Sequence, residues 1–375
     1  MSKLTLKITH LTSAHPRYDT RIFIKMCSSL AVHGYAVSLV VADGKGDEVK
    51  NGVSIFDVGA KTGGRLSRMT KTVSRVFEKA QELDADIYHL HDPELIPAGL
   101  KLKKLGKKVI FDIHENTGLQ IHTKDWIPTL IRPMLSFLYE SYENWACKKF
   151  DKLIVPQLAM QEKYRVFCST ELIGNFPGNN DLSPLPLARN YSKYDLLYSG
   201  GIGSARGLFN MLDLIVELKK RSKKFNLTIA GPISPEELEN AKKHPGWAFT
   251  NYLGELSKEH IYDAYSSNSI GLILLNNVGQ YYMAYSLKLF EYMQNGMLII
   301  MPDFGDWVAF NQKNQVGLNV PVHYSKHIAD VIDGLTESDF NNFGSNGIRL
   351  VETVFNWQSQ EKILLNTYME LLNAK

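Results

Sequence analysis

The sequence predicts an α/β protein with two doubly wound domains, and three observations support this fold class. A strand–helix–strand unit opens the chain at 4–41, where an alternating apolar segment leads into a helical repeat and a second apolar run. A second unit of this kind starts at 195–220, with a strand, a glycine-rich turn and a helix. Between them, 177–194 holds three prolines and three asparagines, a composition typical of a linker.

These observations predict the domain boundaries. The first domain is expected at 1–180 and the second at 190–355, joined by a linker at about 178–193. An amphipathic helix at 356–375 is expected to close the chain. Each predicted domain is long enough to build its own hydrophobic core.

In the first domain, Asp19 is the expected N-cap of a helix that Gly34 ends. The aromatic-rich region 126–150 reads as helical with an interruption near Pro133. Short apolar runs predict strands at 4–11, 37–41, 86–90, 107–113 and 152–156, with an extended segment at 172–177.

In the second domain, Ser286 is the expected N-cap of a helix whose apolar residues recur at helical spacing and which Gly296 ends. Strands are expected at 195–198, 227–230, 249–253, 270–275 and 297–301. This alternation of strands and helices is typical of a parallel sheet covered on both faces.

Charge and composition exclude several classes of protein. The net charge is +3, with 25 basic against 20 acidic residues in 1–185 and 17 against 19 in 186–375, too weak a bias for a nucleic-acid-binding protein. Three scattered cysteines suit a reducing compartment and do not form a zinc motif. No apolar run approaches the roughly 18 residues of a membrane span, so we expect a soluble, cytoplasmic protein.

Two basic clusters in the first half suggest a contact with anionic lipid. The helix expected at 63–77 has arginines and a lysine along one side and apolar residues along the other, and five lysines cluster at 101–108. A basic amphipathic helix can lie on anionic headgroups, which predicts peripheral binding to a membrane. A solvated face over a buried stripe is the equally compatible alternative.

Cations are expected in the first turn of three helices. They are Arg21, Arg206 and Lys288, which follow the expected caps Asp19, Ser204 and Ser286 by two positions. The helix dipole makes this position unfavourable for a cation unless an anion is bound there. We therefore expect all three to face one anionic ligand in a cleft between the carboxyl edges of the two sheets. Glu291, one turn after Lys288, is placed to accept from a ribose or sugar hydroxyl, although an exposed Lys288–Glu291 ion pair is the alternative.

Histidines end two of the expected strands. His89 and His91 lie two apart on one strand and point to one face, where they could bind a metal. Asp92 and Pro93 fit an ordinary helix start, which leaves the metal role as the weaker interpretation. His114 follows the next strand, at the carboxyl edge where ligands bind in open α/β sheets, so it is a candidate catalytic residue.

At these residues the sequence resembles the retaining GT-B glycosyltransferases of family four, especially bacterial enzymes of surface-polysaccharide (O-antigen or capsule) assembly. The motifs run nearly end to end: HPRYDTRIF at 15–23, HLHDPEL at 89–95, FDIHE at 111–115, YSGGIGSARG at 198–207 and SLKLFEYMQNG at 286–296. The resemblance implies the GT-B fold, in which two Rossmann-like domains face each other across a cleft and the last helix crosses back to the first domain.

The resemblance also implies roles for individual residues. The C-terminal domain would bind the donor through Gly201, Gly203, Arg206, Gly254, Ser286, Lys288, Leu289 and Glu291. Arg206 and Lys288 would hold the diphosphate and Glu291 the ribose, while His114 would face the transferred sugar and complete the catalytic set. A loop containing His15, Asp19, Arg21 and Glu115 would lie near the acceptor or the reaction centre.

The sequence departs from the family pattern at two places. Many relatives carry two glutamates eight positions apart, the first of which touches the donor sugar, but here Met283 stands at the first position. An arginine often found in the glycine-rich motif is also replaced, by Gly201 or Ile202. Arg206 is then expected to neutralise more of the diphosphate charge.

The resulting functional prediction is a retaining, metal-independent glycosyltransferase with no cofactor. It would move a sugar from a nucleotide-diphosphate sugar, UDP-linked in preference to GDP-linked, to a lipid-linked saccharide on the cytoplasmic face of the inner membrane. Three alternatives remain open: a GT-B nucleotide-sugar epimerase, a metal hydrolase using His89, His91 and His114, and a non-catalytic protein that binds sugar nucleotides.

Overall fold

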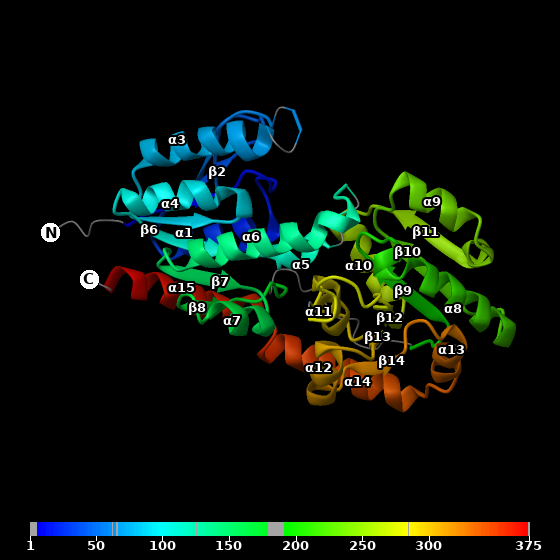
Figure 1. Ribbon diagram of the computed structural model, residues 1–375. Coiled ribbons are helices and arrows are strands. Elements are labelled where there is room, and N and C mark those ends of the chain that lie inside the picture. The colour runs from blue at the N-terminus through cyan, green and yellow to red at the C-terminus, as the bar shows by residue number, and fades with distance from the viewer. Residues whose placement is uncertain are drawn as a thin grey trace. The chain divides into compact units, whose positions relative to one another are not determined.

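The computed structural model describes residues 6–61, 63–64, 67–122, 124, 126–178, 191–283 and 285–373 (Figure 1). They form two compact units. Unit 1 contains the described residues of Met1–Asn175 and Trp357–Lys375, and unit 2 contains those of Phe176–Asn356. Most of the expected linker, 179–190, lies outside the described residues. Within the described part of the chain, no helix is long and apolar enough to cross a membrane.

Unit 1 is built on an eight-stranded sheet with the strand order β3-β4-β2-β1-β5-β6-β7-β8. All of its pairings are parallel except the one between β3 and β4 at the edge. The strands are β1 Lys7–Leu11, β2 Ala36–Val41, β3 Glu48–Lys50, β4 Val53–Asp57, β5 Ile87–Leu90, β6 Lys108–Asp112, β7 Lys152–Val155 and β8 Thr170–Leu172. The sheet puts the carboxyl ends of β1, β5 and β6 side by side, and these ends carry the histidines.

The edge hairpin β3–β4 is absent from the sequence-based prediction, although the sequence contains its signal. Asn51 and Gly52 connect the two strands with positive φ angles of 51° and 74°. Asn-Gly between short strands favours a type I′ turn, in which both central residues need a positive φ.

Helices cover both faces of the unit 1 sheet, as expected for a doubly wound domain. One face packs against α3, α4, α6 and α7, and the other against η1, α1 and α15. The helical elements are η1 Thr20–Cys27, α1 Ser28–Val32, η2 Arg68–Thr72, α3 Val73–Leu83, η3 Pro93–Leu95, α4 Ile96–Lys104, α5 Thr117–Ile121, η4 Thr129–Ile131, α6 Arg132–Cys147, α7 Leu158–Tyr164 and α15 Trp357–Asn373.

The closing helix α15 belongs to unit 1, although unit 2 precedes it in the sequence (Figure 1). Leu364 and Tyr368 are fully buried in the same core as β1 and η1. The indole of Trp357 donates a hydrogen bond of 2.9 Å to Ser29. The return of this helix to the first domain, which the family resemblance implies, is confirmed.

The helix expected after Asp19 forms, but its first two turns are a π-helix. Asp19 accepts hydrogen bonds from the backbone N–H groups of Arg21 and Ile22, as an N-cap should. The N–H of Ile24 bonds to the carbonyl of Asp19 five residues earlier, at 3.1 Å. The helix then continues as α1 and ends before Gly34, whose φ is 86°.

Unit 2 contains a parallel six-stranded sheet with the order β11-β10-β9-β12-β13-β14. The strands are β9 Asp195–Ser199, β10 Asn226–Ala230, β11 Thr250–Gly254, β12 Ile270–Leu272, β13 Leu298–Pro302 and β14 Gly317–Val320. The helical elements are η6 Ser204–Arg206, α8 Leu208–Arg221, α9 Pro235–Lys242, η7 Pro245–Phe249, α10 Lys258–Ser267, α11 Leu287–Gln294, α12 Asp306–Asn314, α13 Ser325–Asp333 and α14 Glu337–Thr353. Two cores, one on each face of the sheet, complete a second doubly wound unit.

Candidate active site

The main predicted donor-binding residues of unit 2 meet at the turn after β9. A side chain on Gly200 would begin 3.5 Å from Nζ of Lys288, and one on Gly201 would begin 3.3 Å from Nη1 of Arg206. Gly200 also has a φ of 98°, which L side chains rarely adopt. The two glycines therefore leave the space beside both cations open.

Lys288 lies in the first turn of α11, as predicted, and is buried with 8% of its surface exposed. Its Nζ donates to the hydroxyl of Tyr198 at 3.1 Å and lies 4.4 Å from the centre of that ring. Burial and the charge of Arg206 lower the pKa of Lys288 to about 7, against the opposite pull of Glu291. An anion bound here would favour the charged ammonium.

Arg206 lies beside the same turn, but its local structure differs from the prediction. It ends the short 3₁₀ turn η6, whose N-cap is Gly203, and α8 begins only after Gly207. Gly207 has a φ of 84°, which closes the 3₁₀ turn before the helix starts. The guanidinium donates to the carbonyl of Gly201 at 2.7 Å and to the hydroxyl of Tyr281 at 3.3 Å.

The N-terminus of α11 has the properties of an anion site. Ser286 is the N-cap by its backbone conformation, yet its side chain makes no capping bond. Its hydroxyl is buried and is one of five buried side-chain polar atoms without a partner among the described residues. The first turn contains no acidic residue. Free N–H groups, a buried hydroxyl and Lys288 thus lie at one helix end.

Glu291 is one turn further along α11, and its Oε2 accepts from the hydroxyl of Tyr265 at 2.8 Å. The Tyr265 oxygen is also 3.2 Å from Oγ of Ser199, which ends β9. The carboxylate is therefore held in place at the strand end that leads into the Gly200 turn.

The other predicted donor residues have different surroundings. Gly254 ends β11, and its carbonyl accepts from the N–H of Gly231 at 2.7 Å, so it supports the same edge of the sheet. Gly203 gives room to the carboxylate of Glu237, which accepts from the N–H of Ser204 at 2.5 Å. The side chain of Leu289 is fully buried in the core, and its place among the donor-binding residues stays a prediction.

The predicted catalytic residue of unit 1, His114, lies at the end of a buried histidine cluster. Its Nε2 is 3.0 Å from Oδ2 of Asp112 and 3.2 Å from Nδ1 of His91. Asp112 is fully buried at the end of β6, and Arg21 binds it with two bonds of 2.8 and 2.7 Å. Although burial raises the pKa of Asp112, the charges of Arg21 and His114 bring it well below its usual value.

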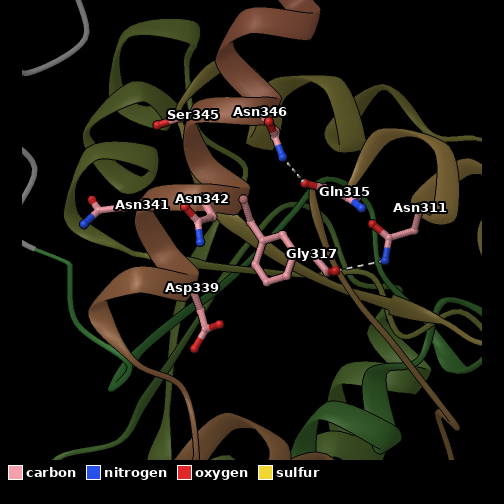
Figure 2. Close-up of a pocket in the computed structure, with 9 residues that line it drawn as sticks. Asn311, Gln315, Gly317, Asp339, Asn341, Asn342, Ser345 and Asn346 are labelled. Atoms are coloured by element: carbon pink, nitrogen blue, oxygen red, sulfur yellow. Dashed lines mark hydrogen bonds between the residues drawn. The ribbon is translucent and has the colours of Figure 1, made fainter.

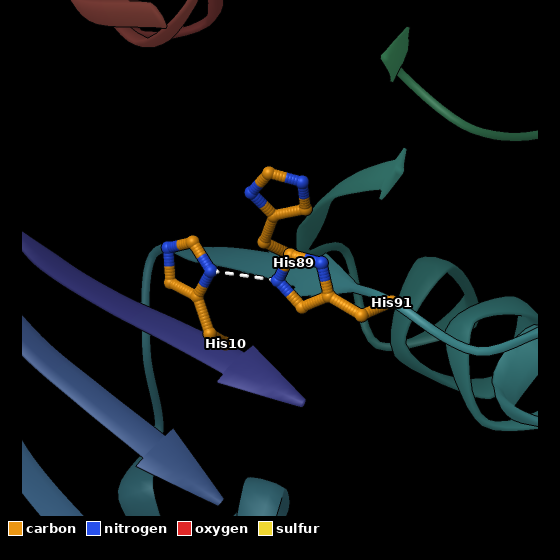
Figure 3. A group of neighbouring side chains, drawn as sticks. All are labelled: His10, His89 and His91. Carbon is orange, nitrogen blue, oxygen red and sulfur yellow. Dashed lines mark hydrogen bonds between the residues drawn. The ribbon is translucent and has the colours of Figure 1, made fainter. Parts of the chain in front are cut away.

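Asp112 sets the direction of a chain of hydrogen bonds through these rings. A carboxylate only accepts, so His91 donates to it through Nδ1 and His114 through Nε2. Nε2 of His91 is then an acceptor, which fixes Nδ1 of His10 as its donor at 2.8 Å (Figure 3). In neutral His114, Nδ1 is left as an acceptor, which suits a hydrogen bond from a sugar hydroxyl.

This chain of hydrogen bonds ends at Tyr368 of the closing helix α15. Nε2 of His10 accepts from the hydroxyl of Tyr368 at 3.2 Å, whose oxygen accepts from Nδ1 of His89 at 2.7 Å. Burial lowers the pKa of His10 and His89 well below the usual value and that of His91 to about 4, so all three rings are neutral at pH 7. Nε2 of His89 is buried without a partner.

The cluster also offers two possible metal-ligand groups in the described part of the chain. They are His10 with His89 and His91, and His91 with Asp112 and His114, in each of which the ligand atoms lie within 4.8 Å of one another. The trio His89, His91 and His114, named for a metal hydrolase, is not one of these groups. In the first group the lone pairs of His10 and His91 already accept protein hydrogen bonds, so the arrangement fits a hydrogen-bonded chain of neutral rings.

Arg21 corrects the expectation of three cations around one anion. It follows its cap by two residues, as predicted, but only 5% of it is exposed. Its guanidinium binds Asp112 and donates to the carbonyl of Ile173 at 2.9 Å. The partner of Arg21 is therefore the buried carboxylate of Asp112 at the end of β6, and not a bound anion.

The predicted acceptor loop is partly assembled. His15 lies 3.3 Å from Asp19 and 3.4 Å from Asp92, and its ring centre is 4.8 Å from that of His114. Although burial lowers the pKa of His15, its bond to Asp19 and the charge of Asp92 raise it overall. Glu115 is exposed, apart from this network.

Sequence reasoning missed several residues of both sites. His10 stands next to the last residue of β1, as His89 does in β5, and the two are register partners, so the matching positions were an available signal. Tyr198 and Tyr265 belong to a strand and a helix whose sequences read as ordinary core, and only the fold brings them to Lys288 and Glu291.

A polar groove of about 660 Å³ lies elsewhere in unit 2, between α12, β14 and α14 (Figure 2). Asn311 donates to the carbonyl of Gly317, and Asn346 donates to that of Gln315. These amides hold the α12–β14 connection in place, and none of the predicted site residues lines the groove.

Comparisons with known proteins agree with this geometry. Residues 20–170 match the model of Glycosyltransferase Family 4. No curated protein matches the chain.

Solved structures share the fold over nearly the whole length. Sucrose-phosphate synthase from Thermosynechococcus elongatus has a TM-score of 0.76 at 16% identity, covering 99% of this chain and 100% of that one. A glycosyltransferase from Rickettsia africae has a TM-score of 0.73 at 15% identity, with 99% and 100% covered. HepE from Anabaena, in complex with UDP and glucose, has a TM-score of 0.69 at 12% identity, with 97% and 100% covered. The chain therefore has the GT-B fold of these structures, and its residues 20–170 are similar to Glycosyltransferase Family 4.

Proposed function

We propose that the protein transfers a sugar from a nucleotide-diphosphate sugar to a saccharide acceptor, with retention at the anomeric carbon and without a metal. The observation that carries this proposal is the pairing of Lys288 and Arg206 beside the open Gly200–Gly201 turn. The charge of Arg206 lowers the pKa of Lys288, and a bound diphosphate would reverse that effect.

In the transition state, negative charge develops on the departing diphosphate. Preorganised cations and helix N–H groups stabilise such charge most where water is excluded. Lys288, Arg206 and the uncapped start of α11 supply these groups in unit 2. Glu291, held by Tyr265, would bind the ribose hydroxyls. In unit 1, we assign His114 to positioning a sugar hydroxyl through Nδ1, with its tautomer set by Asp112.

The finer assignments rest on the sequence resemblance. We propose a UDP-linked donor, in line with HepE, whose structure holds UDP and glucose. We further propose a lipid-linked saccharide acceptor, a role in surface-polysaccharide assembly, and a cytoplasmic location with peripheral membrane contact through the N-terminal domain.

The test is donor turnover by the Lys288→Met and Glu291→Gln variants. UDP-sugars are first screened by thermal stabilisation, and turnover of the best one is followed with a lipid-linked saccharide, with the product anomer read by NMR. Each variant should lose turnover by about 100-fold or more. The control is Lys242→Met, an exposed lysine of α9 paired with Glu239, which should match the wild type.

Near-normal turnover in either site variant would contradict the assignment of the donor site. An inverted product would overturn retention. Release of UDP at the same rate with and without acceptor would favour the epimerase alternative.

A further inference from the structure

Helix α6 packs on the core through small residues, Ala146 and Cys147, together with buried polar side chains, and most of its large apolar residues face outward. On the buried side, Ser136 donates to the carbonyl of Gly118 at 2.9 Å. Glu143 is fully buried and accepts from the hydroxyls of Tyr139 and Tyr164 at 2.7 and 2.6 Å. A surface helix normally turns such residues to water and its apolar stripe to the core.

The outward side of α6 is a continuous apolar face. Leu130, just before the helix, is 96% exposed, and Phe137 is 69% exposed. The outward apolar residues of the helix are Met134, Leu135, Phe137, Leu138, Tyr142 and Trp145. At about 100° per residue they cover roughly 160° of its circumference. The hydroxyl of Ser141, within this face, bonds back to the carbonyl of Phe137 and so needs no water.

Proline extends this face and does not interrupt it as the sequence-based prediction expects. Pro133 stands in the first turn of α6, where a missing N–H is tolerated, directly after the 3₁₀ turn Thr129–Ile131. Exposed Leu130 and Ile131 therefore continue the apolar face of the helix, and Trp126 is exposed nearby in sequence. We name this surface, residues 126–145 on their outward side, the α6 face.

The charges around the α6 face are those of a surface that meets anions. Within 124–149, the three carboxylates are Asp125, whose structure lies outside the described residues, Glu140, paired with Lys163 at 2.8 Å, and buried Glu143. Lys148 and Lys149 are exposed at the end of the helix, and Lys124 is exposed before it. A second copy on this face by two-fold symmetry would bring equal positive charges together, whereas anionic headgroups would neutralise them.

We propose that the α6 face rests on an anionic lipid bilayer, with its leucines, Phe137 and Trp145 inserted among the headgroups and its lysines on lipid phosphates. An apolar helix face with flanking cations and aromatic residues lies in the plane of the interface and inserts about 5–10 Å. The proposal rests on the proposed function, because a lipid-linked acceptor would require the protein to work at a membrane. The α6 face itself was not among the surfaces expected from the sequence.

The second basic cluster expected from the sequence to contact lipid is partly engaged within the protein, because Lys103 and Lys108 pair with Asp151 and Lys107 pairs with Asp84. In the first cluster, Arg75 donates to the carbonyls of Val58 and Ala60, while Arg65 and the side chain of Arg68 lie outside the described residues. The ion pairs favour the α6 face over the cluster at 101–108.

The test is sedimentation of the full-length protein with vesicles, in the absence of any sugar nucleotide. Vesicles of phosphatidylcholine alone are compared with vesicles containing about 30% phosphatidylglycerol, at low and high salt. The wild type should bind the anionic vesicles, and the Phe137→Glu/Trp145→Glu variant should bind about tenfold more weakly or worse. Val32→Glu/Val49→Glu is the matched control, because both valines are highly exposed in unit 1 and the added charge is equal.

A second readout does not depend on a substituted protein folding. Brominated lipid should quench wild-type tryptophan emission, since Trp126 and Trp145 are exposed in this region. Absence of quenching, or equal vesicle binding by both double variants, would overturn the proposal. Loss of binding in Lys104→Glu alone would assign the contact to the 101–108 cluster. If the wild type is dimeric by sedimentation velocity and Phe137→Glu/Trp145→Glu is monomeric, the α6 face belongs to a second copy.

These results are separable from those on the proposed function. The Phe137→Glu/Trp145→Glu variant should keep UDP binding, because neither residue belongs to the donor site. Loss of vesicle binding with intact UDP binding supports the α6 face whatever the donor sugar is.

Discussion

At the residue scale, Lys288 shows how the proposed donor site would respond to an anion. Its pKa of about 7 in the folded protein lies far below the roughly 10.4 of a free lysine. Between these two values the unfolded chain binds more protons than the folded one, so Lys288 makes stability rise with pH in that window. A bound diphosphate would return its pKa toward the ordinary value, because opposite charge favours the ammonium.

The affinity for UDP should therefore fall as pH rises above about 7. Between pH 7.5 and 8.5 the diphosphate is almost fully ionised and the uracil ring is still neutral, so the change in affinity reports Lys288, and we expect close to a tenfold loss over this pH unit. Isothermal titration calorimetry in buffers of different ionisation enthalpy should also show proton uptake on binding.

In Lys288→Met the affinity should be lower and nearly independent of pH over the same range. A pH dependence that survives this substitution would place the titrating group elsewhere.

Single residues also show where the sequence was sufficient. Helix position predicts Lys288 in the first turn of α11 and Glu291 one turn later, whereas Arg206 lies in the 3₁₀ turn η6 and not in the first turn of an α-helix. Arg21 has the same spacing from its cap but binds Asp112. Spacing along a helix does not reveal which carboxylate ends the strand beneath it, because that depends on strand order.

At the element scale, η1 has the N-cap that the sequence predicts, Asp19, but it is a π-helix, which the sequence does not predict. Asp19 and Gly34 mark the helix ends as the sequence indicates, but no residue pattern distinguishes a π turn from an α turn here. The hairpin β3–β4, by contrast, could have been predicted, because Asn51-Gly52 is a recognisable turn sequence. Whether a short edge strand forms depends on what it packs against, so local sequence patterns locate such strands less reliably than helix ends.

Removing the cap of η1 should destabilise the protein modestly. Asp19→Ala should lose about 1 kcal/mol of the free energy of unfolding, measured with urea, while Asp19→Asn should lose less because the amide oxygen still accepts from Ile22. Although burial raises the pKa of Asp19, its bonds to His15 and Ile22 lower it to about 2. The carboxylate therefore stabilises the fold fully above about pH 4, and this contribution is lost as pH falls through 2.

The difference between wild type and Asp19→Asn should thus shrink below pH 4. A difference that stays constant down to pH 2 would show that the charge of Asp19 does not contribute. Glu162→Gln, at an exposed carboxylate of α7 in the same unit, is a control for a general charge effect.

At the scale of the whole molecule, two sheets form two units, each with a core on both faces of its sheet. The sequence predicted both domains and the closing helix, because the strand–helix alternation restarts after a linker. It could not show that Tyr368 of that helix joins the histidine chain, since this contact joins residues far apart in the sequence.

Leu364→Ala should lower the stability of unit 1 and leave unit 2 unchanged. Leu364 is fully buried, and deleting its branched end should cost about 2–5 kcal/mol. In differential scanning calorimetry we expect separate transitions for the two units, with UDP raising only that of unit 2. A shift of the UDP-sensitive transition by Leu364→Ala would contradict this division.

The discontinuous make-up of unit 1 has a consequence for biosynthesis. Unit 2 is contiguous, so its whole sequence has been translated before α15 leaves the ribosome. Unit 1 begins first yet must wait with an open apolar surface beside β1 and η1 until the last helix arrives. The order of completion is then the reverse of the order of synthesis, and premature stop codons before Trp357 should leave nascent chains dependent on chaperones.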